Sequence, residues 1–338
     1  MSFQRIVFTE PYTAKLLEYE PTEPVNDQVK VKLVYSAISS GTERANLVGD
    51  LNISWTNYYE TAVFPRYAGY SSSGIVEAVG ADVTDLKPGD RVAMSWTTHC
   101  QYVTIPEKQV YKLPDNVSFE EGALFHIGTF PLAAIRKCRL EIGESAIVMG
   151  MGILGLNAVK LLRAAGAVPV IAVDPNPAKR EKALSCGADY ALDPTAEEFA
   201  KTVKAITGGG AKVGIEVTGV GQALDNVLDC MACFGRVALL GCTRNSDFTI
   251  DYYHKVHGPG ITLIGAHTNA RPKVESYGGY WTDRDDALAL IKLVSLGRIS
   301  LADMLDEIHS PAEAEEVYHR LAVEKSFPLV LFDWRKLQ

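Results

Sequence analysis

Three glycines, Gly150, Gly152 and Gly155, have the spacing of a loop that holds the phosphates of a dinucleotide. They follow the apolar stretch "AIVM" and open the helix-patterned stretch "ILGLNAVKLLRA". In that setting the first glycine permits a tight turn, the second lets the backbone approach a pyrophosphate, and the third lets helix and strand pack closely. The helix start adds N–H groups and a positive dipole end that favour phosphate. We therefore predict a dinucleotide site here.

A carboxylate beyond the loop supports the same prediction and selects the cofactor. Asp174 ends the next apolar stretch, "VPVIAVD", where it can accept hydrogen bonds from both ribose hydroxyls. A carboxylate at this point repels a 2′-phosphate, so we expect NAD(H) rather than NADP(H). Lys179 and Arg180 follow closely, and we expect one of them along the adenosine edge and the other in solvent.

Further cofactor contacts are expected in the loop and at the ends of the later strands, where a parallel sheet binds its ligand. The stretch "HTNARPKVESYGGYWTDRDD" is polar and aromatic at once, which fits either a lid over a hydroxylated substrate or an exposed connection. The residues expected to contact the cofactor are Gly150, Met151, Gly152, Ile153, Leu154, Gly155, Asp174, Lys179, Thr218, Cys242, Ala266 and His267.

The composition is that of a globular protein and limits the classes of partner. Apolar residues make up 47% of the chain and charged residues 22%. A net charge of −8 without any basic run argues against nucleic acid as a partner. No apolar run approaches the length of a membrane span and no leader pattern opens the chain, so we expect a cytoplasmic protein. Six cysteines are expected as reduced thiols, with Cys230 and Cys233 packing on a helix.

The first third of the chain is expected to form short strands that position any chemistry at their ends. The stretch at 28–39 alternates between apolar and polar residues, and shorter strand-like stretches separated by turns follow it. This spacing predicts a small barrel or sandwich. The expected apolar face of 28–39 carries Val29, Val31, Leu33, Tyr35 and Ala37, and the polar face carries Lys30, Lys32 and Ser36.

From about residue 118 the pattern alternates between strands and helices. Ser118 and Glu121 form an expected capping box at the first helix, and Thr195 and Glu198 are expected to cap a later one at 196–208. The strands between them are nearly continuously apolar, which predicts a parallel sheet with helices on both faces. These strands are expected at 146–150, 168–174, 212–219, 236–241 and 261–266.

The remaining residues form two amphipathic helices and a final strand, 327–334, and the early β part is the candidate for packing against them. We expect a first domain of residues 1–120 and 269–338 and a dinucleotide-binding domain of residues 121–268. The stretch 261–266 resembles the last strand of the sheet, and an apolar sheet edge invites pairing with a second copy. A homodimer or homotetramer is therefore expected.

Several motifs together resemble the medium-chain dehydrogenase/reductase superfamily, to which the zinc alcohol and polyol dehydrogenases belong. They are "GIVEAVGADVTDLKPGDRV", "YVTIPEKQVYKLPDNVSFEEGAL", the "GMGILG" loop, "EVTG" and "GRVALLG". The resemblance covers nearly the whole chain. It implies an α/β protein with a GroES-like β-barrel domain and a Rossmann domain, whose sheet is parallel and doubly wound.

The resemblance breaks at the positions where zinc members of the family hold their catalytic metal. The cysteine position is Ser39, the His-Glu pair is Tyr70 and Ser71, and the third ligand position is His126. One plausible ligand of three does not make a zinc site. The four-cysteine lobe of a structural zinc is also missing, and "SSGTERANLVGD" resembles a branch that lacks the zinc ligands. We therefore expect neither catalytic nor structural zinc.

Without a metal, side chains must hold the substrate oxygen and move its proton. The resemblance gives Tyr70 the role of donor or acid, His126 that of proton relay, and Ser39 a lesser contact. Glu43 is a candidate base or a ligand of substrate hydroxyls. The alternative interpretation is that Tyr70 fills the space of the metal and that Glu43 pairs with Arg44. His99 is expected to be structural.

Three functions remain open at this point. The first is an NAD-dependent, zinc-independent dehydrogenase of an alcohol, possibly a polyol, sugar or cyclitol. The second is an NAD(P)H-dependent reductase of an enone or quinone. The third is a non-catalytic NAD(H)-binding protein, which the intact loop and polar surroundings make less attractive.

Overall fold

The computed structural model describes residues 3–54, 56–57 and 59–337, and its chain divides into two units. Unit 1 comprises Met1–Ile127 and Ala287–Gln338, and unit 2 comprises Gly128–Asp286. Both divisions fall inside helices, α2 (Phe119–Lys137) and α7 (Asp283–Ser295). The sequence predicts boundaries after residues 120 and 268, whereas the two units divide after Ile127 and after Asp286. The limits of the functional domains stay a prediction.

Unit 1 contains two sheets, the short helices α1 (Ser40–Leu47) and α8 (Ala314–Val323), and the adjoining parts of α2 and α7. One sheet has the order β2-β1-β4, and the other has the order β15-β16-β3-β5-β6-β8, with β7 also paired to β3. The strands are β1 (Phe3–Glu10), β2 (Thr13–Tyr19), β3 (Gln28–Ala37), β4 (Arg66–Tyr67), β5 (Ser71–Val79), β6 (Arg91–Ser95), β7 (Tyr102–Pro106), β8 (Val110–Lys112), β15 (Glu307–His309) and β16 (Val330–Asp333).

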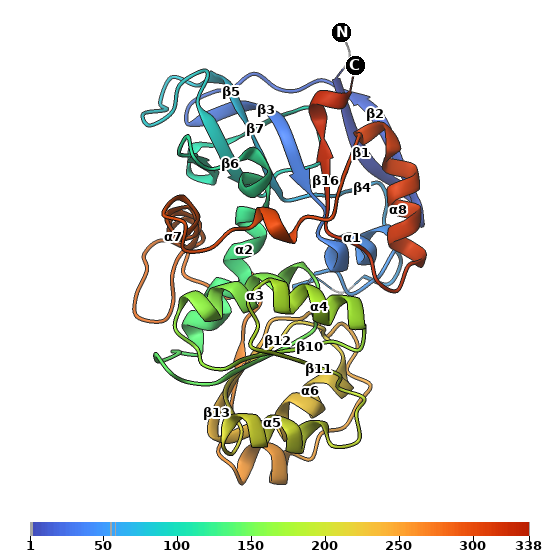
Figure 1. Ribbon diagram of the computed structural model, residues 1–338. Helices are drawn as coiled ribbons and strands as arrows, with labels where there is room; N and C mark the ends of the chain where they lie inside the picture. The colour runs from blue at the N-terminus through green and yellow to red at the C-terminus, as the bar shows by residue number, and fades with distance from the viewer. Residues whose placement is uncertain (1–2, 55, 58, 338) are drawn as a thin grey trace. The chain divides into compact units, whose positions relative to one another are not determined.

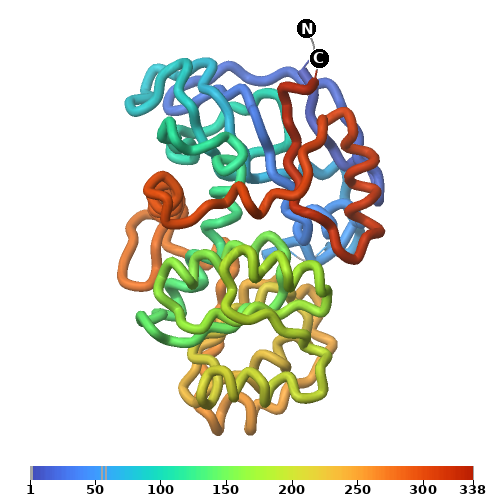
Figure 2. Tube along the Cα trace, viewed as in Figure 1, coloured from blue at the N-terminus to red at the C-terminus, as the bar shows by residue number. Residues whose placement is uncertain are grey.

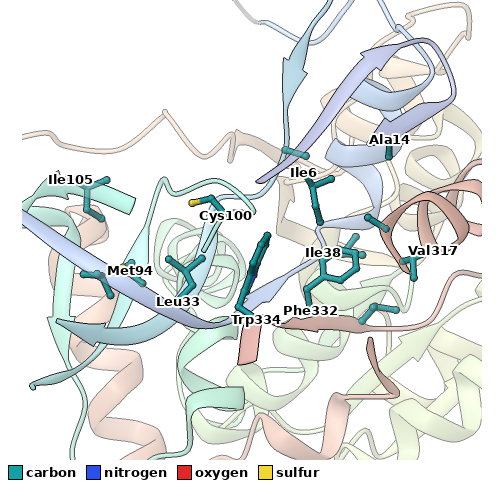
Figure 3. Close-up of a cluster of buried hydrophobic side chains, with 14 of the residues drawn as sticks. Ile6, Ala14, Leu33, Ile38, Met94, Cys100, Ile105, Val317, Phe332 and Trp334 are labelled. Carbon is teal, nitrogen blue, oxygen red and sulfur yellow. The ribbon is translucent and has the colours of Figure 1, made fainter. Parts of the chain in front are cut away.

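The end of the chain returns to the early strands, as the sequence predicts. Strand β16 pairs antiparallel with β3, so that Leu331 lies opposite Ala37. Helix α8 packs on β2 and α1, and Figure 2 shows this last segment (red) beside the first strands (blue) within unit 1. The core that these elements share holds Ile6, Leu33, Met94, Phe332 and Trp334 (Figure 3).

Strand β3 alternates only over its first half. Val29, Val31 and Leu33 are buried and Lys32 is exposed, as the pattern predicts. The prediction is wrong for Ser36, which is 1% exposed, because Trp334 covers it and donates its indole Nε1–H to Ser36 Oγ at 2.8 Å.

Unit 2 is a six-stranded parallel sheet in the order β11-β10-β9-β12-β13-β14. Figure 1 shows α3 and α4 on one face and α5 and α6 on the other, which confirms the predicted doubly wound sheet. The order reverses between β9 and β12, the switch point at which such sheets bind ligands. The strands are β9 (Ala146–Met149), β10 (Val170–Val173), β11 (Tyr190–Leu192), β12 (Ala211–Glu216), β13 (Met231–Leu239) and β14 (Thr262–Gly265), and the helices are α3 (Ile153–Ala164), α4 (Pro177–Ser185), α5 (Phe199–Thr207) and α6 (Gly221–Asp229).

Two local predictions for unit 2 are wrong. The helix expected through the two cysteines ends at Asp229, and β13 begins at Met231 because Met231 pairs with Ala211. Cys230 is therefore buried at a helix end, whereas Cys233 lies exposed on a strand. The helix expected from residue 196 begins at Phe199, because Asp193 holds Thr195 in a turn.

The capping box at the start of α2 forms in part. Ser118 Oγ accepts a hydrogen bond from the Glu121 N–H at 3.1 Å. The Glu121 carboxylate does not bind the Ser118 N–H but accepts from the Leu301 N–H at 3.0 Å, within the same unit. Among the described residues, no helix is long and apolar enough to cross a membrane.

Candidate active site

The glycine loop of unit 2 has the geometry that its spacing predicts. Gly150 follows β9 with φ of +100°, a conformation that favours glycine. A Cβ on Gly155 would lie 1.8 Å from the Gly150 carbonyl oxygen, so this position admits only glycine. A Cβ on Gly152 would meet no atom within 4 Å, so there is open space at the position where a pyrophosphate is expected. The loop therefore fits a dinucleotide.

Asp174 directly follows β10 and is hydrogen-bonded to this loop. Its two carboxylate oxygens accept hydrogen bonds at 2.9 Å, one from the Met151 N–H and one from the Asn176 N–H. The side chain is 7% exposed, and a carboxylate has further lone pairs that can accept from ribose hydroxyls. Asp174, the residue predicted to bind the ribose, is thus joined to the loop by a hydrogen bond.

The two basic residues beyond Asp174 differ in their contacts. Arg180 Nη1 donates to the carbonyl oxygens of Asp174 and Pro175 and pairs with Asp193 at 3.1 Å. Its guanidinium therefore braces the β10–α4 loop. Lys179 is half-buried on α4, and its predicted contact with the cofactor stays a prediction.

The remaining predicted cofactor residues lie after the ends of β12, β13 and β14. Thr218 packs beside the loop, since a Cβ on Gly150 would lie 2.7 Å from its methyl group. Buried Glu216 holds this turn by accepting from the Thr218 N–H at 2.6 Å, and burial raises the pKa of Glu216. Cys242 is exposed and Ala266 is buried at the adjoining strand ends.

His267 follows Ala266 and lies in a positive environment. Burial lowers its pKa, and nearby Lys137, Arg244 and Lys273 lower it further. Its Nδ1 accepts a hydrogen bond from the Asn269 N–H at 3.2 Å. A neutral imidazole that accepts at Nδ1 carries its proton on Nε2, and is therefore a donor there.

The polar and aromatic segment after His267 is fastened to α2 within unit 2. Arg271, whose side chain is 4% exposed, pairs with Asp283 at 2.8 Å and donates to the Thr129 carbonyl oxygen at 3.2 Å. Arg136 lies 3.5 Å from the centre of the Trp281 ring. These contacts favour an anchored connection over a lid that opens along its whole length.

In unit 1 the structure brings Ser39 and Tyr70 together. Ser39 lies two residues after the end of β3 and is the N-cap of α1, and Tyr70 directly precedes β5. The Tyr70 hydroxyl donates to Ser39 Oγ. The hydroxyl of an N-cap serine ordinarily caps its helix, but Ser39 makes no such bond and is turned to Tyr70.

Two further rings complete this cluster, which we call the hydroxyl–aromatic cluster: Ser39, Tyr70, Trp96 and His126. The His126 ring lies edge-on to Tyr70, with ring centres 5.7 Å apart, and 4.6 Å from Trp96. His126 is 1% exposed, whereas Trp96 is 42% exposed and has φ of +60°. A bulky residue in the left-handed region is strained, and such strain concentrates at binding sites.

Trp96 was not predicted from the sequence. The preceding residues read as an ordinary strand, and nothing in the pattern signals a left-handed tryptophan. Its N–H donates to the Tyr70 carbonyl oxygen at 2.8 Å, so its place depends on a partner 26 positions earlier.

Within unit 1, the serines of β5 hold the first half of α2, and with it His126, against that strand. Ser71 Oγ donates to the Ala123 carbonyl oxygen and Ser73 Oγ donates to the Phe119 carbonyl oxygen, both at 2.6 Å. Because Ser71 adjoins Tyr70 and Ala123 lies one helical turn before His126, these bonds fix the two rings relative to each other.

The residues at the family's metal positions do not fit zinc. Ser39 and Tyr70 offer neutral hydroxyl oxygens that are bonded to each other, and His126 is the single imidazole among the three. Zinc sites use thiolate, imidazole and carboxylate ligands. Across 3–54, 56–57 and 59–337, no three His, Cys, Asp or Glu side chains could hold a metal ion together.

Glu43 and His99 lie inside unit 1. Glu43 is 1% exposed and bonds to the Ser39 N–H, His99 and Tyr318. The expected ion pair between Glu43 and Arg44 does not form, because Arg44 points away and donates to the Glu324 carbonyl oxygen at 2.6 Å. Both His99 nitrogens are hydrogen-bonded, which supports the structural role expected for it.

These features define a class: an oxidoreductase with a dinucleotide loop in one unit and a hydroxyl–aromatic cluster in the other. Comparison with known proteins agrees. The alcohol dehydrogenase GroES-like domain profile matches residues 26–115, and the zinc-binding dehydrogenase profile matches residues 154–278.

Individual relatives extend this match along the chain. (R,R)-butanediol dehydrogenase of Bacillus subtilis is 31% identical over 66% of this chain and 72% of its own. D-guloside 3-dehydrogenase of Escherichia coli is 25% identical over 93% and 95%. A zinc-binding dehydrogenase structure from Sinorhizobium meliloti, bound to NADP, superposes with a TM-score of 0.82 at 22% identity, covering 98% and 99%.

The chain belongs to the medium-chain dehydrogenase/reductase superfamily, with a GroES-like domain and a Rossmann domain. It is an oxidoreductase of the alcohol dehydrogenase type that acts on a small-molecule substrate.

Proposed function

We propose that the protein is an NAD-dependent, zinc-independent dehydrogenase of a hydroxylated substrate, such as a polyol, sugar or cyclitol. The observation that carries the proposal is the hydrogen bond between Tyr70 and Ser39 at two positions where zinc relatives have metal ligands. Two relatives named for a guloside and a butanediol support the substrate class.

In the proposed reaction the Tyr70 hydroxyl turns from Ser39 Oγ to donate to the substrate oxygen, and Ser39 then donates to the phenolic oxygen and orients it. When bound, NAD+ supplies the hydride acceptor. Tyr70 is the donor that stabilises charge on the substrate oxygen, a task that zinc performs as a Lewis acid in relatives. We assign the proton relay to His126, whose ring is held edge-on to Tyr70, and a stacking surface for the substrate to exposed Trp96.

For the cofactor we propose NAD(H), held by the residues predicted from the sequence. Asp174 supports NAD(H), since its carboxylate repels a 2′-phosphate and Arg180 is engaged by Asp193. The NADP in the Sinorhizobium meliloti structure keeps NADP(H) as the alternative.

The function is tested with chelator-treated protein. We expect NADH formation with a panel of polyols and glycosides to persist after dialysis against 1,10-phenanthroline, with zinc far below one equivalent by mass spectrometry. Loss of activity on chelation and its return with zinc would contradict zinc independence.

Two other functions are outcomes of the same assays. NAD(P)H oxidation with enones or quinones, and none with alcohols, would favour the reductase. Tight NADH binding with no turnover, and no effect of Tyr70→Phe on any measured property, would favour a binding protein.

We also propose a homodimer or homotetramer. Strand β14 is at one end of the sheet order, and its Leu263 and Ile264 are only partly buried. Light scattering after size-exclusion chromatography tests this, and a mass of one chain would contradict it.

A further inference from the structure

A carboxylate buried in unit 1 holds the turn that carries Ser39. Glu43 is 1% exposed and lies in the first turn of α1. One carboxylate oxygen, Oε1, accepts from the Ser39 N–H at 2.8 Å. The other, Oε2, accepts from the Tyr318 hydroxyl at 2.5 Å and faces His99 Nε2 at 3.1 Å. Glu43 thus joins the N-cap of α1 to helix α8.

Further hydrogen bonds extend this network beyond His99. The Trp334 indole can only donate, and it donates to Ser36 Oγ at 2.8 Å. Ser36 Oγ is hydrogen-bonded to His99 Nδ1, 2.7 Å away, and His99 Nε2 is hydrogen-bonded to Glu43. Each of these buried side chains thus has a hydrogen-bond partner. Burial beside Glu43 raises the pKa of Tyr318, which therefore stays a donor.

We propose that Glu43 is a positioning residue, which fixes Ser39 and through it the Tyr70 hydroxyl for the reaction. The proposal rests on the proposed function, in which Tyr70 binds the substrate oxygen. Glu43 acts through Ser39 in this proposal, since it is 1% exposed and its carboxylate is already hydrogen-bonded within unit 1. Because it holds the Ser39 backbone, the Ser39 hydroxyl is directed to Tyr70 rather than used as a helix cap.

If Glu43 had a purely structural role, its substitution would affect stability and not catalysis. Asp90 provides a control for that outcome. Asp90 is a buried carboxylate of the same unit that accepts from the Lys87 N–H at 3.1 Å and pairs with Lys112 at 2.9 Å. It precedes β6, whereas Trp96 follows the other end of that strand. Asp90→Asn is therefore a matched control for the loss of a buried carboxylate without contact to Ser39.

The kinetic test is a double-mutant cycle between Glu43→Gln and Tyr70→Phe. We expect Glu43→Gln to lower kcat by about tenfold or more, because small displacements of catalytic groups are costly, with little change in dinucleotide affinity. In the Tyr70→Phe background it should cause no further loss of kcat, since coupled residues are not additive. Asp90→Asn should lower the unfolding temperature and leave kcat unchanged. Additive losses, or an unchanged kcat in Glu43→Gln, would overturn the proposal.

A second readout does not depend on turnover. With 3-fluorotyrosine at position 70, the 19F resonance should shift or split in Glu43→Gln and stay as in the parent in Asp90→Asn. If Glu43→Gln does not fold, Tyr318→Phe, which removes one donor but keeps the ring, should move the resonance and lower kcat about threefold. An unmoved resonance refutes positioning even if the enzyme has another substrate, whereas a moved resonance without alcohol oxidation refutes only the proposed function.

Discussion

The glycine loop of unit 2 and the hydroxyl–aromatic cluster of unit 1 differ in what defines them. The loop is a backbone shape, in which Gly155 lies against the Gly150 carbonyl oxygen and Asp174 holds the Met151 N–H. The cluster is a set of side chains, and in our proposal its chemistry differs from that of zinc relatives because Ser39 stands at the position of a cysteine. A site defined by backbone shape depends little on side-chain identity, whereas a site made of side chains changes its chemistry with them.

The largest effect on one site without an effect on the other is expected at Tyr70. We expect Tyr70→Phe to lower kcat roughly 100- to 1,000-fold, because a general acid or donor contributes on this scale. The affinity for NADH, measured by fluorescence titration, should stay the same, since the loop lies in unit 2. A variant that keeps more than half of the parental kcat would reduce Tyr70 to a space-filling residue.

Two alanine substitutions test the loop, because one is expected to disturb the backbone and the other is not. Gly155→Ala forces a backbone shift, so we expect at least about a hundredfold weaker NADH binding together with lower stability. Gly152→Ala has room for its methyl group and should fold normally, while binding NADH about tenfold more weakly. Isothermal calorimetry and thermal unfolding measure both effects, and equal behaviour of the two variants would contradict the loop geometry.

Asp174 tests which dinucleotide the loop of unit 2 prefers. In Asp174→Ser the ratio of NADPH to NADH dissociation constants should fall about tenfold, because the charge that repels the 2′-phosphate is gone. NADH binding should also weaken, since the Met151 N–H loses its acceptor. Titrations with both dinucleotides test this, and an unchanged ratio would remove Asp174 from cofactor selection.

The smallest effect is expected at Glu307, which lies in unit 1 and has no contact with the cluster. Hydrogen bonds from Arg320, and then from His309, lower the pKa of Glu307 from 4.5 to about 2. Because the folded-state pKa is depressed, the stabilisation is complete above pH 4.5 and is lost as the pH falls toward 2. Glu307 is one-third exposed, so Glu307→Gln should cost only about 1 kcal/mol at pH 7.

Urea unfolding at pH 7 and at pH 3 checks this, and the difference from the parent should shrink at the lower pH. Activity should be unchanged. A loss of kcat in Glu307→Gln would show that the reaction depends on residues beyond the cluster and the Glu43 network.

The sequence predicts the parts of the fold that depend on local pattern. Five of the six strands of the parallel sheet and the loop between β9 and α3 follow from apolar runs and glycine spacing. Strand β11 is only three residues long, with Tyr190 exposed, and leaves no such pattern. The local pattern places Cys230 and Cys233 on one helix. It does not show that β13 begins at Met231, because the partner that pairs with Met231, Ala211, lies on another strand.

The candidate site is predictable to a smaller extent. Ser39, Tyr70 and His126 follow from comparison with the family's ligand positions. The contacts of Glu43 do not, since Tyr318 lies 275 positions away and nothing local marks the pair. The left-handed backbone of Trp96 is likewise fixed by tertiary contacts.

The bracing of Arg180 has a consequence for redesign. Its guanidinium already binds Asp193 and two carbonyl oxygens. Removing the charge of Asp174 therefore does not make Arg180 available to bind the 2′-phosphate of NADP(H). A switch of coenzyme would also require a substitution that frees Arg180, for instance Asp193→Asn. The β10–α4 loop would then be less rigid.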